Sequence, residues 1–139
     1  MEASIAEIKT FLSSPKTLAI VGASTKESKA GNYVPKFLQD RDFTIIPINP
    51  FADEILGEAT IKDLDNLDTE VDGVIIYRNS EAATAEVKKA VDRGIEWIWL
   101  PEGVTSEIGK KYAEHRKFVQ DKCPKALIEK WKKEGEWNQ

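Results

Sequence analysis

Apolar residues along the chain switch repeatedly between two patterns, one typical of strands and one typical of helices. Four short runs are almost continuously apolar, as in strands buried on both faces of a sheet, and they cover residues 17–21, 43–48, 71–77 and 95–100. Between these runs, apolar residues recur every three or four positions, which is the spacing of one helix face. The alternation predicts an α/β fold, a doubly wound parallel sheet of about five strands with helices on both faces.

Capping residues and helix breakers suggest where the first helices begin and end. The pattern Ser-x-x-Glu at Ser4 predicts a helix that ends near residues 13–15. A second helix is expected to begin near Asn32, with Pro35 tolerated because it lies in the first turn. Ser80 is expected to cap a third helix.

The remaining segments are less regular. Residues 57–67 are interpreted as a short edge strand followed by a helical turn. A further helix is expected to carry Ile108, Tyr112 and Ala113, and a last helix to run from Pro124 to about residue 133.

The predicted topology locates a ligand crevice. Right-handed crossovers place the first strand in the centre of the sheet, beside the strand at 71–77. In such sheets ligands bind at the carboxyl ends of the strands, where the strand order reverses. Three segments are therefore expected to converge there: 22–29, 77–80 and 100–103.

Composition narrows the class of protein. The 139 residues fit one ordinary domain, and neither repeat nor linker divides them, so we expect a single domain over 1–139. The net charge of −4 and the dispersed positive residues argue against nucleic acid as a partner. Apolar runs are too short for a membrane span, and the single cysteine, Cys123, suits a cytoplasmic protein without an internal disulfide.

The loop after the first strand has features of a phosphate site. Gly22 follows the strand directly and allows the backbone to approach an anion. Ser24 and Thr25 offer hydroxyl groups, Lys29 offers a positive charge, and the next helix is expected to direct its positive end toward the loop. A single glycine in such a loop is equally compatible with a tight turn.

Two common nucleotides fit this loop poorly. The dinucleotide fingerprint requires glycines where this chain has Ser24 and Glu27, and an acidic residue where it has Asn49 and Pro50. The Gly-Lys-Ser/Thr triplet of nucleoside triphosphate sites does not occur in the sequence.

Other residues offer little catalytic chemistry. His115 is interpreted as an ordinary helix residue, and Cys123 as a small buried side chain, with a reactive thiol as the alternative. Trp97 and Trp99 are assigned to the core. Arg78 is more informative, because it ends a buried strand in the predicted crevice, where a guanidinium group suits phosphate.

Several short motifs follow one another along the chain: AIVGAS, Lys29, IIPINP, the triplet Ile-Leu-Gly at 55–57, VDGVIIYRNSEA, WLPEGV and DKCP. In order and spacing, they resemble those of the small stand-alone CoA-binding proteins, which are related to the CoA-binding domain of the succinyl-CoA synthetase alpha subunit. The resemblance extends from about Thr17 to Pro124. It implies a Rossmann-like fold that holds coenzyme A in the crevice described above. The chain has no room for the separate domain with the synthetase's phosphorylated histidine, so ligase activity is not expected.

The resemblance also implies which residues contact the ligand. They are Gly22, Ala23, Ser24 and Thr25 along the pyrophosphate, Lys29 at a phosphate, Asn49 and Pro50 on the adenosine side, Tyr77, Arg78 and Ser80 facing the ligand from the fourth strand, and Glu102, Gly103 and Val104 beside the pantetheine arm. Asn49 is compatible with a phosphorylated ribose, which an aspartate would repel.

Three functions follow as hypotheses. The leading one is non-catalytic binding of CoA or an acyl-CoA. The second is an NADP-type dinucleotide-binding enzyme or redox sensor. The third is a protein-interaction domain with a closed pocket, in which Trp131 and Trp137 dock a partner. Whether the chain forms a homo-oligomer stays open.

Overall fold

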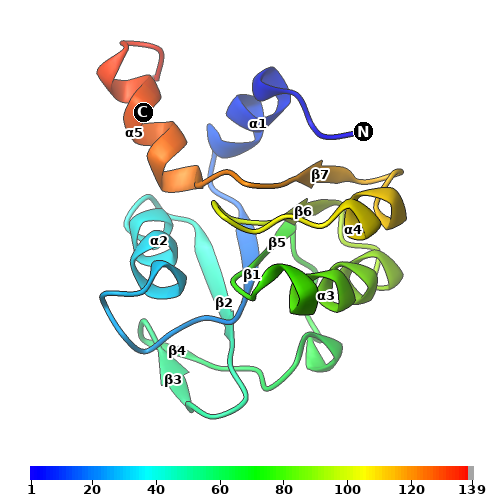
Figure 1. Cartoon of the computed structure of the whole chain (residues 1–139). Helices are drawn as coiled ribbons and strands as arrows, with labels where there is room; N and C mark the ends of the chain where they lie inside the picture. Colours follow the sequence, from blue (N-terminus) through cyan, green and yellow to red (C-terminus); the bar gives the residue numbers. More distant parts are fainter. Residues whose placement is uncertain (138–139) are drawn as a thin grey trace.

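A five-stranded parallel sheet runs through the molecule in the order β2-β1-β5-β6-β7 (Figure 1). The computed structural model describes residues 1–137, so the last two residues of the predicted domain lie outside the described part. The strands of this sheet are β1 (Thr17–Val21), β2 (Thr44–Ile48), β5 (Gly73–Ile76), β6 (Trp97–Trp99) and β7 (Lys117–Val119), and a separate hairpin contains β3 (Glu54–Ile55) and β4 (Glu58–Ala59). The helices are α1 (Ile5–Leu12), α2 (Ala30–Gln39), α3 (Ser80–Asp92), α4 (Glu107–Tyr112) and α5 (Pro124–Lys133), with a 3₁₀ turn, η1 (Leu64–Asn66).

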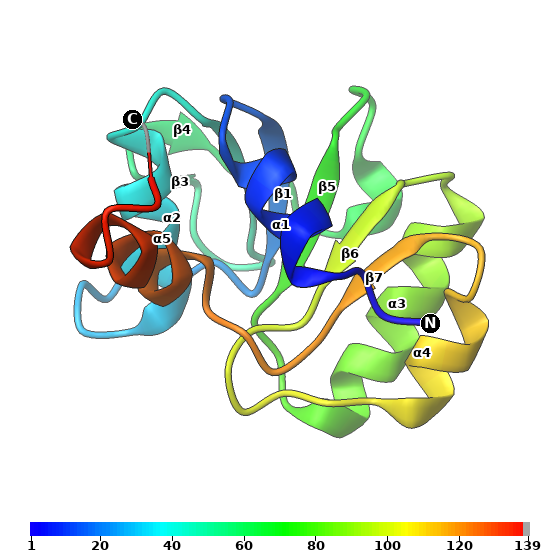
Figure 2. The same cartoon turned by 90° about the horizontal axis from the view of Figure 1, so that it is seen from above.

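Helices cover both faces of the sheet, which confirms the predicted fold class. Helices α1, α2 and α5 contribute to one core cluster, whereas α3, α4 and η1 line the other (Figure 2). Alternate residues of β1 point to opposite faces: Leu18 and Ile20 belong to the first cluster, and Ala19 and Val21 to the second. The strand is therefore apolar at each of these four positions because both of its faces are buried.

The strand order reverses at β1, as predicted. β1 pairs with β2 on one side and with β5 on the other, both in parallel. Val21 is aligned with Ile48 and with Ile76, so the three strands end at the same edge of the sheet. The loops that follow them form the crevice.

The fifth strand is not the one expected from the sequence. The short strand within 57–67 is β4, which forms a hairpin with β3 outside the main sheet. The fifth strand of the sheet is β7, which pairs with β6. Its three residues, KFV, are too few to show a periodicity, and only its neighbour defines it as a strand.

Helix α2 begins earlier than the sequence suggested. Its first residue is Ala30 rather than a residue near Asn32, so Pro35 lies in the second turn and not in the first. A proline at this position cannot donate to the carbonyl four residues before it, which belongs to Gly31. That carbonyl instead accepts a hydrogen bond from the N–H of Ser24 at 3.2 Å. Because of the proline, the Gly31 carbonyl is free to accept this hydrogen bond, which connects the loop after β1 to α2.

The predicted cap is confirmed for α1 and corrected for α3. Ser4 and Glu7 form the predicted capping box of α1. The cap of α3 is Asn79, not Ser80, because the Asn79 side chain accepts the N–H of Ala82 at 2.8 Å. Asparagine and serine are both good caps, so propensity alone could not choose between adjacent residues.

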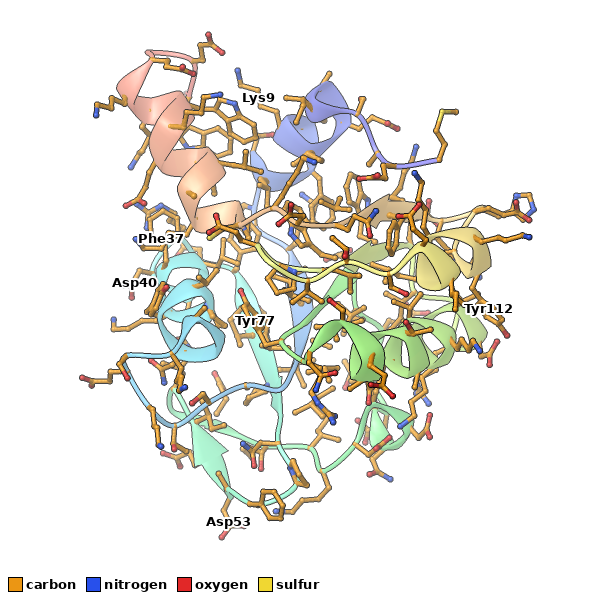
Figure 3. All side chains as sticks on the ribbon, viewed as in Figure 1. Lys9, Phe37, Asp40, Asp53, Tyr77 and Tyr112 are labelled. Carbon is orange, nitrogen blue, oxygen red and sulfur yellow. The ribbon has the colours of Figure 1, made fainter. Side chains whose placement is uncertain are left out.

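Helix α4 buries a different face from the one its apolar residues suggested. Ile108 is 67% exposed, and Tyr112 lies at the surface, 45% exposed (Figure 3). Ala113 is buried as expected, but it is joined on the inner side by Gly109, where a Cβ would lie 3.3 Å from Cγ2 of Val87 in α3. Close packing against α3 therefore leaves room only for a small residue at this point.

Within residues 1–137, none of the helices is both long enough and apolar enough to span a bilayer.

Candidate functional site

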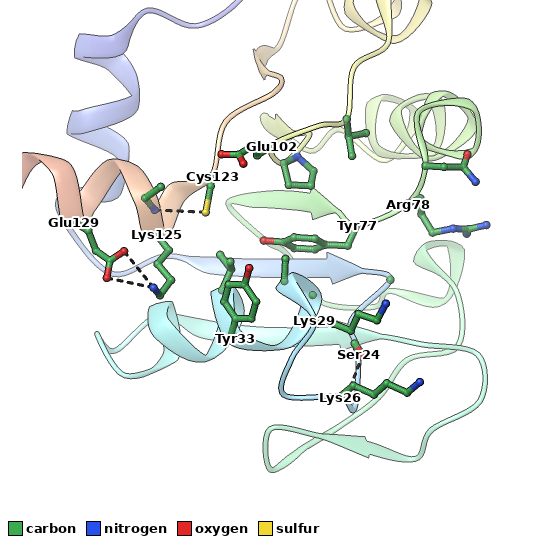
Figure 4. Close-up of a pocket in the computed structure, with 18 residues that line it drawn as sticks. Ser24, Lys26, Lys29, Tyr33, Tyr77, Arg78, Glu102, Cys123, Lys125 and Glu129 are labelled. Carbon is green, nitrogen blue, oxygen red and sulfur yellow. Dashed lines mark hydrogen bonds and ion pairs between the residues drawn. The ribbon is translucent and has the colours of Figure 1, made fainter.

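Two cavities lie at the carboxyl edge of the sheet, on either side of the loop after β1. The larger one, of about 780 Å³, extends from this loop past the ends of β5 and β6 to the start of α5 (Figure 4). The smaller one, of about 610 Å³, lies between the same loop, the end of β2 and α3. Both are lined by Gly22, Ser24, Lys26 and Arg78. The loop after β1 therefore separates two adjacent cavities.

Most of the predicted site residues line these cavities. Those on the larger cavity are Gly22, Ser24, Lys29, Tyr77, Arg78, Glu102 and Val104. Those that line the smaller one and not the larger are Ala23, Thr25, Asn49 and Pro50. Ser80 and Gly103 line neither of the two cavities. Ser80 Oγ accepts the N–H of Thr105 at 3.1 Å, and the N–H of Gly103 donates to Asp121 Oδ1 at 2.7 Å, so both stabilise the rim loop.

Gly22 is required by the close approach of two backbone segments. Its φ is +75°, and a Cβ at this position would lie 2.1 Å from the carbonyl oxygen of Tyr77. No side chain fits there without moving β5. The glycine thus allows the loop to cross the end of β5 while keeping its backbone at the cavity wall.

The loop amides are shared between the fold and the cavity. The N–H of Gly22 donates to the carbonyl of Ile48, and that of Ser24 to Gly31, each at 3.2 Å. Within residues 1–137, the N–H groups of Ala23 and Thr25 have no acceptor. Of the four residues assigned to the pyrophosphate, Gly22 and Ser24 therefore use their N–H groups to hold the loop in place. The N–H groups of Ala23 and Thr25 remain available to a ligand.

Helix α2 begins at the larger cavity without a side-chain cap. Its N-cap residue, Lys29, makes no side-chain hydrogen bond to the helix, and the first turn contains no acidic residue. The N–H groups of Ala30 and Gly31 have no acceptor in the described part of the chain, and both residues line the cavity. Each of the other helical segments in residues 1–137 has a side-chain cap, formed by Ser4, Asp63, Asn79, Ser106 or Cys123.

Asn49 stabilises the loops rather than offering a free polar group. Its amide nitrogen donates to the carbonyl of Ala23 at 2.9 Å. Its oxygen accepts the N–H groups of Phe51 at 2.7 Å and Ala52 at 2.9 Å. Asn49 therefore shapes the smaller cavity by connecting the ends of β1 and β2. Phe51, 90% exposed, forms the outer edge of that cavity.

Among the cations that line the cavities, Arg78 lies near a buried acid that the sequence analysis missed. Lys26, Lys29 and Arg78 line the larger cavity, whereas Glu86 of α3 lines the smaller one. Arg78 Nη1 lies 3.8 Å from Glu86 Oε1, and Lys89 Nζ lies 3.7 Å from the same oxygen. Glu86 is 7% exposed, and its Oε2 has no hydrogen-bond partner among the described residues. Burial raises the pKa of Glu86, although the nearby Lys89 and Arg78 lower it in part.

The position of Glu86 could have been noticed in the sequence. It falls on the helix face formed by Ala83, Val87 and Ala90, where a carboxylate is unusual. A charged residue on the buried face of a helix indicates a partner or a polar cavity.

The far wall of the larger cavity carries a phenol and a thiol. Tyr77 extends from the end of β5 into the space between Cys123 and Tyr33 (Figure 4). Its hydroxyl is buried and has no hydrogen-bond partner within residues 1–137. Burial raises the pKa of Tyr77 well above its ordinary value, and the nearby Cys123 and Tyr33 add to this effect.

Cys123 is not the buried side chain that the sequence favoured. It is half-buried, lines the larger cavity and caps α5, its Sγ accepting the N–H of Ala126 at 3.5 Å. Lys125 and Glu129 line the same wall and form an ion pair at 3.2 Å. The sequence placed a thiol at a helix start, but only the structure brings that helix to the crevice.

The other candidates lie away from the cavities. The His115 side chain is 90% exposed and faces Glu114. Trp99 is 2% exposed, and Trp97 stacks on Phe11 with ring centroids 4.2 Å apart, so both belong to the core as predicted. No group of three or more metal-binding side chains occurs in the described part of the chain.

The aromatic C-terminal end is folded back on its own chain. Trp131 is 4% exposed and stacks on Trp137, with ring centroids 5.6 Å apart. The hypothesis of a docking surface formed by these two rings needs Trp131 to be exposed, which it is not.

Comparison with known proteins connects this geometry to one family. A family model described as a CoA binding domain matches residues 16–129. The chain is 31% identical over 122 residues to the uncharacterized protein YneT of Bacillus subtilis, covering 86% of this chain and 90% of that protein. It is also 29% identical over 106 residues to an ADP-forming acetate–CoA ligase of Methanocaldococcus jannaschii, covering 76% of this chain but only 15% of the ligase.

Solved structures share the same fold. A Thermus thermophilus protein, cell-free ID.343, superposes with a TM-score of 0.83 at 26% identity, covering 90% of this chain and 96% of that one. A conserved hypothetical protein of Pyrococcus furiosus has a TM-score of 0.74 at 28% identity, covering 82% and 98% of the two chains.

Proposed function

Because this chain belongs to the family of CoA-binding domains, we propose that it binds coenzyme A or an acyl-CoA across the two cavities, without transforming it. In this arrangement the pyrophosphate lies at the loop after β1, where the two cavities meet. The adenosine half occupies the smaller cavity beside Asn49 and Pro50, and the pantetheine arm runs through the larger cavity past Tyr77 and Glu102.

The observation that carries this proposal is the uncapped start of α2. An uncapped helix start has free N–H groups and a partial positive charge, both of which favour an anion. Here the N–H groups of Ala30 and Gly31 lie at the cavity, and the charged Lys29 and Arg78 line the same wall. A phosphate at this point would supply the acceptor that the helix itself lacks.

The arrangement also accounts for the missing acidic residue at the end of β2. An acid there holds the free ribose hydroxyl of NAD, but it would repel the ribose phosphate of CoA. This chain has Asn49, whose amide group is occupied by backbone partners, and Lys26 and Lys62 line the same cavity. Their positive charge suits a phosphorylated ribose, which CoA and NADP share.

A binding role is preferred to a catalytic one because of what the cavity-lining groups contact. In the described structure, the hydroxyl and thiol groups that line the cavities have no hydrogen bond to a histidine or a carboxylate. A nucleophile activated by a neighbouring base requires such a contact.

Calorimetric titration of the reduced protein with CoA, dephospho-CoA and NADP tests the proposal. We expect CoA to bind about tenfold more tightly than dephospho-CoA, because one charge-assisted phosphate contact is worth roughly 1.4 kcal/mol. NADP should bind more weakly than CoA, since it has no pantetheine arm to fill the larger cavity. Tighter binding of NADP would favour the dinucleotide hypothesis instead. A folded sample that binds none of the three would disprove the proposal.

A matched pair of variants controls for general charge effects. Lys29→Ala removes a cation at the cavity, whereas Lys130→Ala removes one from the exposed side of α5. We expect only the first to weaken CoA binding. Equal effects would mean that the attraction is a property of the whole surface rather than of this site.

A further inference from the structure

We infer that Cys123 is a site of covalent modification by the ligand itself, through a mixed disulfide with the thiol end of coenzyme A. The inference rests on the proposed function, because it needs the pantetheine arm to lie in the larger cavity. It adds a reversible covalent state of the same complex.

The position of the thiol is the first argument. The larger cavity extends from Gly22 and Lys29, where the phosphates are proposed, to Cys123 at the start of α5. The reactive sulfur of CoA is at the end of the pantetheine arm, remote from the phosphates. A ligand anchored by its phosphates therefore directs its own sulfur toward the wall that holds Cys123.

The surroundings of the sulfur are the second argument. Cys123 Sγ accepts the N–H of Ala126, so a backbone dipole of the ten-residue helix α5 points at it. The side chain is half-buried and therefore reachable from the cavity. Two carboxylates line this part of the cavity: Glu129 is paired with Lys125, whereas Glu102 lies nearer Cys123 (Figure 4).

An independent observation favours a polar partner at this end of the cavity. Tyr77 lines the cavity, and its hydroxyl is buried with no hydrogen-bond partner within residues 1–137. Burying such a group without a partner is costly, roughly 1–3 kcal/mol. The pantetheine arm contains two amide groups, and either could pair with this hydroxyl beside Cys123.

The chemical step is thiol–disulfide exchange with the symmetrical disulfide of CoA. The Cys123 thiolate attacks one sulfur of that disulfide, so that a bond forms between Sγ and this sulfur while the original S–S bond breaks. The second CoA leaves as a thiolate and takes up the proton that Cys123 gave up. Cys123 is oxidised and the departing sulfur is reduced, so the reaction needs no further oxidant.

Intact-protein mass spectrometry tests the inference directly. Because the chain has one cysteine, any disulfide adduct must be at Cys123. Reduced protein is mixed with CoA disulfide or with glutathione disulfide at equal concentration. We expect an adduct of one CoA, reversed by dithiothreitol, that forms at least about tenfold faster than the glutathione adduct because binding aligns the two sulfurs. In denaturant the two disulfides should react at similar rates.

Two variants refine the test. Lys29→Ala should reduce the rate with CoA disulfide toward the glutathione rate, because it weakens the anchor and leaves the thiol untouched. Cys123→Ser should abolish the adduct, and serine is a good helix cap, so α5 should keep its start.

The outcomes separate the inference from the proposed function. If reduced CoA binds by calorimetry but no adduct forms, the inference is wrong and the proposed function stands. The inference is also wrong, with the proposed function intact, if CoA disulfide and glutathione disulfide react at equal rates with the folded protein. If reduced CoA does not bind at all, the proposed function fails and the inference fails with it.

Discussion

Helices α2 and α3 both begin at the rim of the larger cavity, yet their first turns are built differently. Helix α3 begins with a complete cap: Asn79 accepts the N–H of Ala82, and Glu81 adds an acidic residue to the first turn. The N-cap residue of α2, Lys29, makes no such bond, and the first turn of α2 contains no acidic residue. The first turn of α3 has a side-chain acceptor for one of its free N–H groups, whereas the first turn of α2 has none.

The difference leaves the N–H groups at the start of α2 without a side-chain acceptor. An uncapped helix start costs roughly 1 kcal/mol of stability. In α2 the compensation is backbone packing: a Cβ at Gly31 would lie 2.8 Å from the carbonyl of Gly22, so loop and helix are in direct contact. The carbonyl of Gly31, freed by Pro35, accepts the N–H of Ser24. Contacts with the loop after β1 thus stabilise the start of α2, while the N–H groups of Ala30 and Gly31 have no acceptor within residues 1–137.

The largest expected effect comes from breaking this backbone contact. Gly22→Ala should lower the free energy of unfolding by roughly 2–5 kcal/mol, because it combines a left-handed backbone with a severe overlap. Gly57→Ala is the matched control, since its φ is +79° but a Cβ there meets nothing within 4 Å. We expect it to cost only about 1 kcal/mol. Urea denaturation measures both, and equal losses would contradict the role of the Tyr77 carbonyl.

The two helix starts themselves can be compared by a crossed pair of variants. Asn79→Ala should lower the free energy of unfolding by about 1 kcal/mol, because it removes the cap of α3. Lys29→Ala should change it by less than about 0.5 kcal/mol, since Lys29 caps nothing. CoA affinity should follow the opposite order, with Lys29→Ala weakening binding about tenfold and Asn79→Ala much less.

Denaturation curves and calorimetry on the same preparations give both quantities. The comparison fails if Lys29→Ala destabilises the fold as much as Asn79→Ala does, because Lys29 would then cap α2 after all.

A smaller effect is expected at the carboxylate that holds Arg78. Burial raises the pKa of Glu86, so the folded state binds its proton more tightly than the unfolded chain does. Stability should therefore fall as the pH rises above the ordinary pKa of 4.5. Glu86→Gln should remove this loss and be the more stable protein at pH 7. It should also free Arg78 for the ligand, tightening CoA binding by about twofold, the worth of a weak ion pair.

Melting temperatures of both proteins between pH 4 and pH 8 provide the measurement. A Gln variant that is less stable at pH 7 and unchanged at pH 4 would mean that the ionised Glu86 is favourable to the fold.

The smallest effect is expected at the best-capped helix start. In α1 the Glu7 carboxylate accepts hydrogen bonds from Lys117 and from the backbone of Ser4, which lower its pKa from 4.5 to about 2. A lowered pKa in the folded state stabilises the fold above pH 4.5, and this contribution is lost as the pH falls toward 2. Glu7→Gln should therefore flatten the acid limb of the stability profile.

The matched control for Glu7 is Glu58→Gln, in the exposed β3–β4 hairpin. It should leave the acid limb unchanged. Parallel acid limbs for the wild type and Glu7→Gln would contradict the assignment.

The sequence was most informative where burial on both faces leaves an unbroken apolar run. Strand β1 was predicted at its observed bounds, and α5 very nearly so, from apolar spacing alone. The start of α2 was placed two residues late, because a proline within a helix normally lies in the first turn. Pro35 is tolerated in the second turn because the Gly31 carbonyl accepts the N–H of Ser24 instead. Strand β7 was missed because three residues carry too little pattern.

The candidate site was anticipated in part for the same reason. Residues that directly follow strands, such as Gly22 and Arg78, could be assigned to the crevice because parallel strands end at one edge. Glu86 could be recognised as a charge on a buried helix face, but neither it nor Cys123 could be assigned to the crevice, since each reaches a cavity from a helix.

What the sequence alone determined is the alternation of buried strands and amphipathic helices, and with it the parallel sheet and the edge at which the two cavities lie. These follow from local periodicity, which each segment carries by itself. The tertiary structure decided which loop amides remain free, which acid holds Arg78 and that the single thiol faces the cavity. Those features depend on contacts between segments that are distant in the chain, and local sequence patterns do not predict such contacts.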